Sequence, residues 1–192
     1  MVQIVIQPLD DVMRVYGDRL SKLSQGMQNR VLYRTLNAEG DKLKTRVIRT
    51  ITKQTGLKRK VIVKAVKRRA AFAGRLEYRL TTHGGNIRVK FFGAREGKGG
   101  VTAKPRGQAT FYSGAFTKSG RKGQRRMSPK LKGHAFRNVE GGKWRGKIKV
   151  VRSEVYIPEE MVTGDTKMTF EITAPQILAQ VGKQLARVLS GH

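Results

Sequence analysis

Hydrophobic and polar residues alternate over the first seven positions of the chain. One face would carry the apolar residues Val2, Ile4 and Ile6, and the other would carry Gln3, Val5 and Gln7, of which only Val5 is apolar. Alternation with a period of two is typical of a strand with one buried face. A basic leader and a long apolar run are both missing here, so we expect a short strand and not a signal peptide.

Two helices are predicted next, from apolar residues spaced three, four and seven apart. In the first, Asp10 and Asp11 follow Pro8 and can cap a helix that runs toward Leu23. The second is longer, and Gly40 lies on its apolar stripe as a candidate for close packing. The stripe is Met27, Val31, Leu32, Leu36, Leu43, Val47 and Ile51, and the outer face carries Arg30, Arg34, Lys42, Lys44, Arg46, Arg49 and Lys53. The segment Thr55-Gly56-Leu57 is predicted to end it.

The next segments predict mainly strands. Residues 58–67 (KRKVIVKAVK) fit neither period cleanly, so helix and strand both stay open, and a helix followed by a strand is favoured. Residues 77–92 predict a hairpin with one apolar and one basic face, because two alternating runs flank the turn sequence HGGN. Residues 144–157 are expected to return the chain to the same sheet.

Between residues 93 and 142 the chain is rich in glycine, lysine and arginine and poor in large apolar residues. Such a segment buries too little apolar surface to offset its conformational entropy. We therefore expect an extended or mobile arm, with some strand near Phe111 and Phe136, that becomes ordered in an assembly.

The C-terminal part is predicted to be helical. Pro158 with Glu159 and Glu160 suits a helix start, residues 164–165 (Gly-Asp) interrupt the pattern, and Pro175 restarts it. The last amphipathic helix carries Ile177, Leu178, Val181, Leu185, Val188 and Leu189.

Together the predicted elements indicate an α+β fold: a long N-terminal helix and a C-terminal helix packed on a small, mostly antiparallel β-sheet. We expect one domain over 1–192, with the basic arm at 93–142 inside it.

The amount and placement of positive charge indicate more about function than any motif does. The formal net charge is +28 over 192 residues, with an isoelectric point near 11.3. Between Gln54 and Arg152 the only carboxylates are Glu77, Glu96 and Glu140. This block is expected to face a polyanion or the acidic surface of a partner. Cysteine is absent, which excludes disulfides and thiolate metal sites.

The sequence offers little catalytic chemistry. His83, His134 and His192 are expected to have surface or structural roles, and neither HxxxH nor DxD spacing occurs. Residues 141–148 (GGKWRGKI) resemble a phosphate loop, but Ile148 stands where a Ser or Thr must hold magnesium. We therefore predict no enzyme, with no catalytic residues, cofactor or metal. No apolar segment approaches the roughly 20 residues needed to cross a bilayer, so no membrane contact is expected either.

Basic clusters are the candidate functional residues. Each cluster alone suits a solvated face, but together, with almost no acid between them, they favour contact with DNA or an acidic partner. The candidates are Lys58, Arg59, Lys60, Lys67, Arg68, Arg69, Arg79, Arg88, Lys90, Arg121, Lys122, Arg125 and Arg126. Lys130 and Lys132 form a further cluster. The aromatic residues of the arm follow no known base-stacking motif, so we expect them to pack in a core or interface.

Several of these segments, taken in order, resemble the minor tail protein Z family of tailed phages and prophages. They are KQTGL with the following RKV, GRLEYR, GGNIRVKFFGAR, GHAFRN and YIPEEMV. The likeness runs from about Leu36 nearly to the C-terminus and is weakest over 117–133. It implies a virion structural protein, a tail-completion component at the head-proximal end of the tail that joins tail to head around the DNA channel.

The resemblance also implies the partners. They are other phage tail and neck proteins, further copies of this chain in a ring for which six-fold symmetry is favoured, and DNA in the channel. The protein would be made in the host cytoplasm and reside at the head-tail junction of the virion. The alternative is a stand-alone nucleic-acid-binding protein with a basic extension, similar to ribosomal proteins. An enzyme acting on nucleic acid is disfavoured by the lack of clustered acids.

Overall fold

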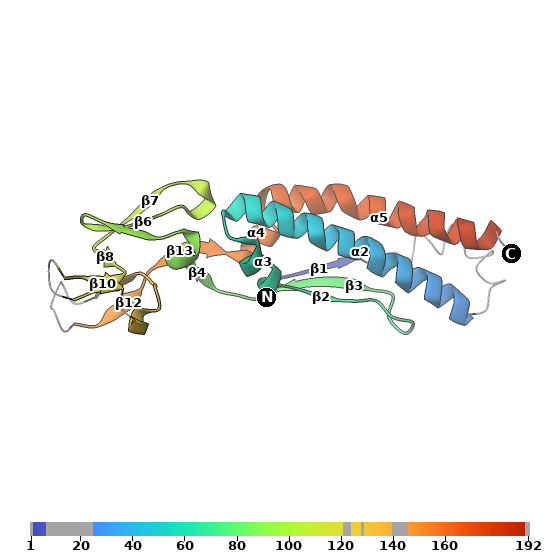
Figure 1. The fold of residues 1–192 in the computed structure, drawn as a ribbon. Helices are drawn as coiled ribbons and strands as arrows, with labels where there is room; N and C mark the ends of the chain where they lie inside the picture. Colours follow the sequence, from blue (N-terminus) through green and yellow to red (C-terminus); the bar gives the residue numbers. More distant parts are fainter. Residues whose placement is uncertain (1, 7–24, 121–123, 128, 140–145, 191–192) are drawn as a thin grey trace.

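The structure, a computed structural model, describes residues 2–6, 25–120, 124–127, 129–139 and 146–190. Within the helices it leaves the side chains of residues 25–29, 185, 188 and 189 undescribed. The helix predicted over residues 9–23 lies outside these ranges. The described residues form an elongated molecule, with two long helices toward one end and short strands toward the other (Figure 1).

The long helix predicted from the apolar stripe is confirmed as α2, Gln25–Thr55. Its buried side chains are spaced as a single helical face: Leu32, Leu36, Leu43, Val47 and Ile51, all with 5% exposure or less. The helix ends where the sequence indicated. Gly56 has a φ of 72°, a left-handed conformation that glycine adopts readily, and its N–H donates to the Thr52 carbonyl at 3.1 Å.

A three-stranded antiparallel sheet packs against α2. It has the order β1-β3-β2, from β1 Val2–Ile6, β3 Tyr78–Thr82 and β2 Val66–Arg69. The predicted N-terminal strand is thus confirmed, and so is the favoured helix then strand after α2, as α3 Arg59–Ala65 followed by β2. Tyr78 and Leu80 are buried between the sheet and α2. Figure 1 shows α2 lying between this sheet and α5.

The hairpin predicted over residues 77–92 is wrong. The strand β4, Asn86–Arg88, pairs with β13, Arg152–Tyr156, in a separate sheet. The cause is that β3 already pairs on both sides, with β1 and β2, so no free edge is left for β4. Residues 89–92 then form a 3-10 helix, η1, which buries Val89 and Phe92 and leaves Phe91 39% exposed.

The glycine-rich segment forms more regular structure than expected. Strands near Phe111 and Phe136 are confirmed, but they belong to two antiparallel three-stranded sheets, β5-β6-β7 and β12-β11-β8. The strands are β5 Arg95–Gly97, β6 Gly100–Ala103, β7 Thr110–Ser113, β8 Ala115–Phe116, β9 Lys118–Ser119, β10 Arg126–Met127, β11 Phe136–Asn138 and β12 Ile148–Val150. Short 3-10 helices, η2 Pro105–Gly107 and η3 Pro129–Leu131, connect them. Strand pairing with a small core of Val101, Ala103, Ala115 and Ala135 replaces the large apolar residues that the segment lacks.

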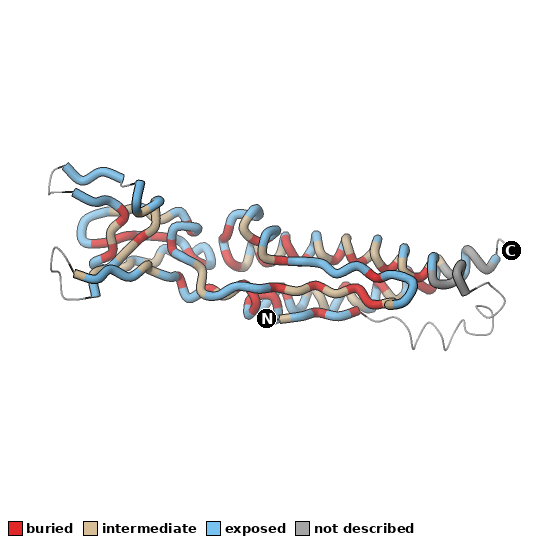
Figure 2. Tube along the Cα trace, turned by 90° about the horizontal axis from the view of Figure 1, so that it is seen from below, coloured by how far each residue is buried: buried red, intermediate tan, exposed pale blue. Residues whose placement is uncertain are grey.

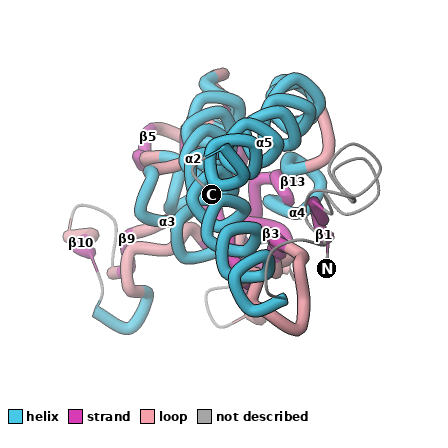
Figure 3. Tube along the Cα trace, turned by 90° about the vertical axis from the view of Figure 1, so that its right-hand side faces the viewer, coloured by secondary structure: helices cyan, strands magenta, loops and turns pink. Residues whose placement is uncertain are grey.

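The C-terminal helices differ from the prediction at one point. The break at Gly164 is confirmed, between α4 Ile157–Met161 and α5 Gly164–Ser190, but Pro175 lies inside α5 and does not restart it. A proline within a helix costs about 3 kcal/mol. Burial of Thr173, Ile177 and Val181 against α2, on both sides of the proline, offsets that cost. Seen end-on, α2 and α5 lie side by side (Figure 3).

The α+β fold class is confirmed, with one revision. The expected single sheet is instead several small sheets, and every strand pair in them is antiparallel. Within the described ranges, no helix has both the length and the apolar character that a membrane span requires.

Candidate polyanion interface

The predicted basic cluster after α2 lies on one exposed helix and the strand that follows it. The seven residues of α3 bury only Ile62, while Lys58, Arg59 and Lys60 at its start are exposed. The next strand, β2, is an edge strand that buries Val66 and exposes the other three residues. None of the three basic residues at the start of α3 forms an ion pair with any described residue.

The β2–β3 register decides which of the basic residues face outward. Lys67 lies opposite Thr81, and Arg69 lies opposite Arg79, on the sheet face turned away from α2. Arg68 lies opposite the buried Leu80 and pairs instead with Asp41 of α2. Figure 2 shows the exposed residues along β2, one strand of this hairpin, beside the buried and intermediate residues of β3. The outward face therefore carries Lys67 and Arg69, which have no ion pair in the described part of the chain.

Glu77 is an internal counterion and not part of the outer surface. Its carboxylate is 9% exposed and binds Arg75 at 2.8 Å and Arg79 at 2.5 Å. The hydrogen bond from Arg75, followed by that from Arg79, lowers the pKa of Glu77 although burial acts to raise it. The predicted site residue Arg79 is thus largely neutralised. Arg79 was expected to meet a partner, but it stabilises its own hairpin.

Glu96 is a second internal counterion, in the β-rich part of the molecule. One of its oxygens accepts hydrogen bonds from the Thr117 N–H at 2.6 Å, the Thr117 hydroxyl at 2.9 Å and the Lys118 N–H at 2.8 Å. The other pairs with Arg125 at 3.0 Å. Burial acts to raise the pKa of Glu96, but these donors together hold it below its usual value. Arg125, another predicted site residue, is therefore partly neutralised too.

The remaining predicted residues have three different outcomes. Arg126 is exposed in β10 without an ion pair among the described residues, whereas Arg121 and Lys122 lie outside the described ranges. Arg88 and Lys90, in β4 and η1, contact the turn at residues 132–134 that follows η3. Arg88 Nη1 lies 3.2 Å from His134 Nε2, and Lys90 Nζ donates to the Lys132 carbonyl.

His134 is the histidine that the structure places among cations. Burial, followed by Arg88, Lys90 and Lys132, lowers the pKa of His134 below its usual value. Phe91 packs edge-on against its ring, with the ring centroids 6.3 Å apart. Because an arginine only donates hydrogen bonds, Nε2 must accept the one from Arg88, so the neutral ring carries its proton on Nδ1. That nitrogen is buried and has no hydrogen-bond partner in the described structure.

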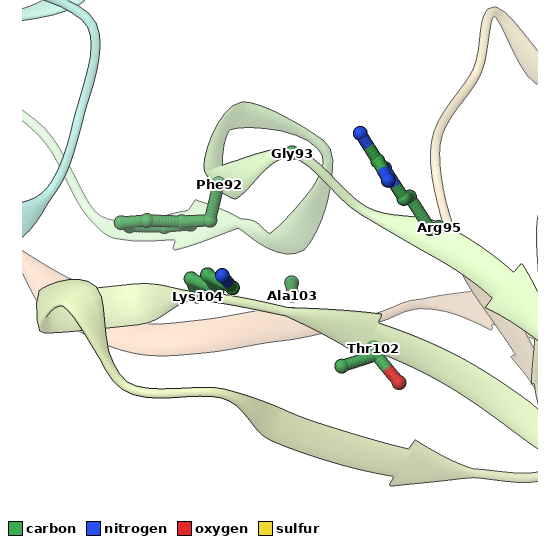
Figure 4. A pocket seen from close by; sticks show the side chains of 6 residues that line it. All are labelled: Phe92, Gly93, Arg95, Thr102, Ala103 and Lys104. Carbon is green, nitrogen blue, oxygen red and sulfur yellow. The ribbon is translucent and has the colours of Figure 1, made fainter.

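A second cationic feature is a pocket of about 330 Å³ in the β-rich part. Figure 4 shows its lining: Phe92, Gly93, Arg95, Thr102, Ala103 and Lys104. Arg95 and Lys104 are exposed, and neither has an ion pair within the described ranges. Phe92 and Ala103 supply buried apolar surface. The pocket can accommodate an anionic group, although neither of these two cations was among the predicted site residues.

An exposed aromatic residue was also missed by the sequence analysis. Phe72 is 53% exposed at the tip of the β2–β3 hairpin. The tip is held rigidly, because Asn37 exchanges two 2.8 Å hydrogen bonds with the backbone of Ala71, and Phe72 and Arg75 form a bridge. No periodicity marks Phe72, since it lies between two strands. Its exposure only becomes evident when the hairpin is built.

The described part of the chain offers no cluster of side chains for a metal site. No group of three or more His, Cys, Asp or Glu side chains is placed there to hold a metal ion. Residues 141–145 of the phosphate-loop-like segment lie outside the described residues, and Ile148 begins strand β12 where a phosphate loop would continue into a helix.

Comparisons with known proteins give no match to a protein-family model, a curated protein or a solved structure. The resemblance to the tail protein family therefore stays a prediction.

Proposed function

We propose that this chain is a non-catalytic structural subunit of a phage tail. It acts as a tail-completion component at the head-proximal end, where it joins tail to head around the DNA channel. The ordered resemblance over most of the chain carries this proposal. The partners would be other tail and neck proteins and further copies of the chain in a ring, with six-fold symmetry favoured.

The distribution of charge supports a surface that faces a polyanion. Within the basic block, the carboxylates of Glu77 and Glu96 are buried and bound to arginines, so they do not offset the outer cations. The outward residues of α3 and β2 keep their full charge in consequence. Lys and Arg arranged in this way bind phosphates without reading sequence. Such binding suits a subunit that lies beside packaged DNA.

Exposed apolar residues support contact with other subunits. Five large ones among the described residues are each at least 53% exposed: Phe72, Phe111, Met127, Met168 and Ile172. Met168 and Ile172 are four residues apart and therefore lie on one face of α5. A subunit that assembles with neighbours would cover such residues.

A stand-alone nucleic-acid-binding protein is the second candidate. The observation in its favour is the exposed Phe72 beside the cations of β2, because an aromatic ring flanked by Lys and Arg can stack on a base. Salt dependence separates the two functions. Independent binding should be tight and fall steeply with added salt, whereas a tail component should bind DNA weakly as a single subunit.

The decisive experiment deletes the gene in the phage or prophage that encodes it and supplies the chain in trans with a tag. We expect the deletion to yield unjoined heads and tails, and the tagged chain to co-purify with tails and give density at the head-tail junction in electron microscopy. Recovery only in ribonucleoprotein particles, with normal virions from the deletion strain, would overturn the proposal.

Paired variants test the surface itself. The double variant Lys67→Gln/Arg69→Gln removes two outward cations, and we expect it to lower the yield of joined particles. Lys42→Gln/Lys167→Gln removes the same charge from cations that pair with Glu39 and Glu171 on the helices. We expect this control to leave the yield unchanged. Equal yields from the two double variants would contradict a role for the outer face of the sheet.

A further inference from the structure

Four basic residues from two separate segments meet in one place. Arg88 and Lys90 come from β4 and η1, and Lys132 and His134 come from the turn after η3, more than forty residues later in the chain. The two contacts that join the segments are Arg88 Nη1 to His134 Nε2 at 3.2 Å and Lys90 Nζ to the Lys132 carbonyl. We call these residues the Arg88 cluster.

The cations of this cluster differ from three other arginines in the kind of group that accepts their hydrogen bonds. Arg68, Arg79 and Arg125 are positioned by carboxylates, which neutralise them. Arg88 and Lys90 are positioned by neutral acceptors, an imidazole nitrogen and a backbone carbonyl. Their geometry is therefore fixed while their charge is kept, which is the condition for binding an anion.

The surroundings add further positive charge. Arg88 lies directly opposite Arg152 in the β4–β13 pair, and like charges in that position repel each other. Lys132 has a φ of 47°, a left-handed conformation that is unfavourable for a residue with a side chain. No carboxylate in the described part of the chain pairs with Arg88, Lys90, Lys132 or Arg152. Residues with strained backbone of this kind cluster at ligand-binding and active sites.

We propose that the Arg88 cluster is a phosphate-binding site. Arg88 would donate to two phosphate oxygens through the planar guanidinium, Lys90 and Lys132 would supply point charges on the same group, and His134 would position Arg88. A tetrahedral phosphate offers more oxygens to three converging cations than a carboxylate does. The source of the phosphate rests on the proposed function, which places DNA beside the subunit, whereas the site itself does not depend on it.

The test uses the full chain, with the His134 imidazole nitrogens observed by NMR during titration with inorganic phosphate at constant ionic strength. We expect saturable shifts and a raised His134 pKa, because a bound anion offsets the neighbouring cations. Arg88→Gln/Lys90→Gln should weaken phosphate binding at least about tenfold, as expected for loss of charge-assisted hydrogen bonds. Lys42→Gln/Lys167→Gln removes the same charge from α2 and α5, where each lysine pairs with a carboxylate, and should leave the titration unchanged. A circular dichroism spectrum checks that both variants are folded.

A second titration identifies the source of the phosphate. A short DNA duplex that shifts the same His134 signals points to the DNA backbone, and a response to inorganic phosphate alone points to a free phosphate ligand. No response to either probe, or equal weakening in both double variants, would overturn the site. Failure of the chain to join heads and tails would instead overturn the proposed function and leave the phosphate titration as it stands.

Discussion

The ring of Tyr78 lies directly against Gly40. A Cβ atom on residue 40 would come within 2.6 Å of two ring carbons, a distance that no relaxed structure tolerates. The hydroxyl of the same tyrosine donates to Asp41 at 2.8 Å, and Asp41 also binds Arg68. Burial, followed by the hydrogen bond to Asp41, raises the pKa of Tyr78 above its usual value. One glycine thus allows α2 to approach β3, and the residue after it links α2 to β3 and β2.

Gly40→Ala should destabilise the protein, although alanine favours a helix by about 1 kcal/mol over glycine. The added methyl group must displace the Tyr78 ring, and such overpacking costs about 1–3 kcal/mol. Urea denaturation measures the change. Combining it with Tyr78→Ala should cost less than the sum of the two single changes, because the clash is then removed. Simple additivity would show that the ring is not the obstacle.

Two glycines of one hairpin should differ in their response to alanine. Gly97 and Gly100 are cross-strand partners in β5 and β6. A Cβ at Gly100 would lie 2.4 Å from the Tyr112 carbonyl oxygen, whereas a Cβ at Gly97 has no atom within 4 Å. We expect Gly100→Ala to lower stability by about 1–3 kcal/mol and Gly97→Ala to change it by less than about 0.5 kcal/mol. Thermal denaturation of both variants measures this difference. Similar melting temperatures would contradict the close packing of Gly100 against the Tyr112 carbonyl.

Gln54 of α2 should contribute more to stability than Gln176 of α5. Its amide donates to Glu160 Oε2 at 2.6 Å and accepts from the Thr166 N–H at 3.2 Å and hydroxyl at 3.0 Å. Gln54→Ala removes these bonds at the α4–α5 junction and should cost about 1–3 kcal/mol. Gln176→Ala is the control, because Gln176 accepts one long bond of 3.4 Å from Arg46. If Gln176→Ala were equally destabilising, the hydrogen bonds of Gln54 at the α4–α5 junction would not be the source of the effect.

Acid should weaken the fold through Glu96. The pKa of Glu96 in the folded protein lies below its ordinary value of 4.5. A carboxylate of this kind adds stability above its unfolded pKa, and that stability is lost as the pH falls through the folded pKa. We therefore expect the urea midpoint to fall between pH 7 and about pH 3.

Glu96→Gln isolates that contribution. It should lower stability at pH 7 by about 1–3 kcal/mol, because buried donors lose a charged acceptor, and it should reduce the loss on acidification. Glu171→Gln changes an exposed carboxylate whose partner Lys167 is 3.8 Å away, and should alter neither quantity measurably. An unchanged pH dependence in the Glu96 variant would place the acid sensitivity elsewhere, in Glu77 for example.

The sequence by itself determined the elements whose signal is local. The stripe from Leu32 to Ile51 predicts α2 because helical periodicity depends only on neighbours within two turns, and Gly56 marks its end for the same reason. The alternation at Ile4 and Ile6 predicts β1 equally well. The abundance and placement of positive charge, and the scarcity of acids between Gln54 and Arg152, are likewise properties of the sequence.

Only the tertiary structure decided which residues meet. Strand pairing joins segments far apart in the chain, so β4 pairs with β13 and not with its neighbour β3. The same long-range contacts sort the cations: Arg79 and Arg125 are neutralised by buried carboxylates, whereas Arg88 is held by His134 and keeps its charge. Periodicity carries no information about such partners, because a side chain at a given register can face acid, base or solvent. The sequence therefore predicts a basic protein, and the fold selects the cations that remain available for a ligand.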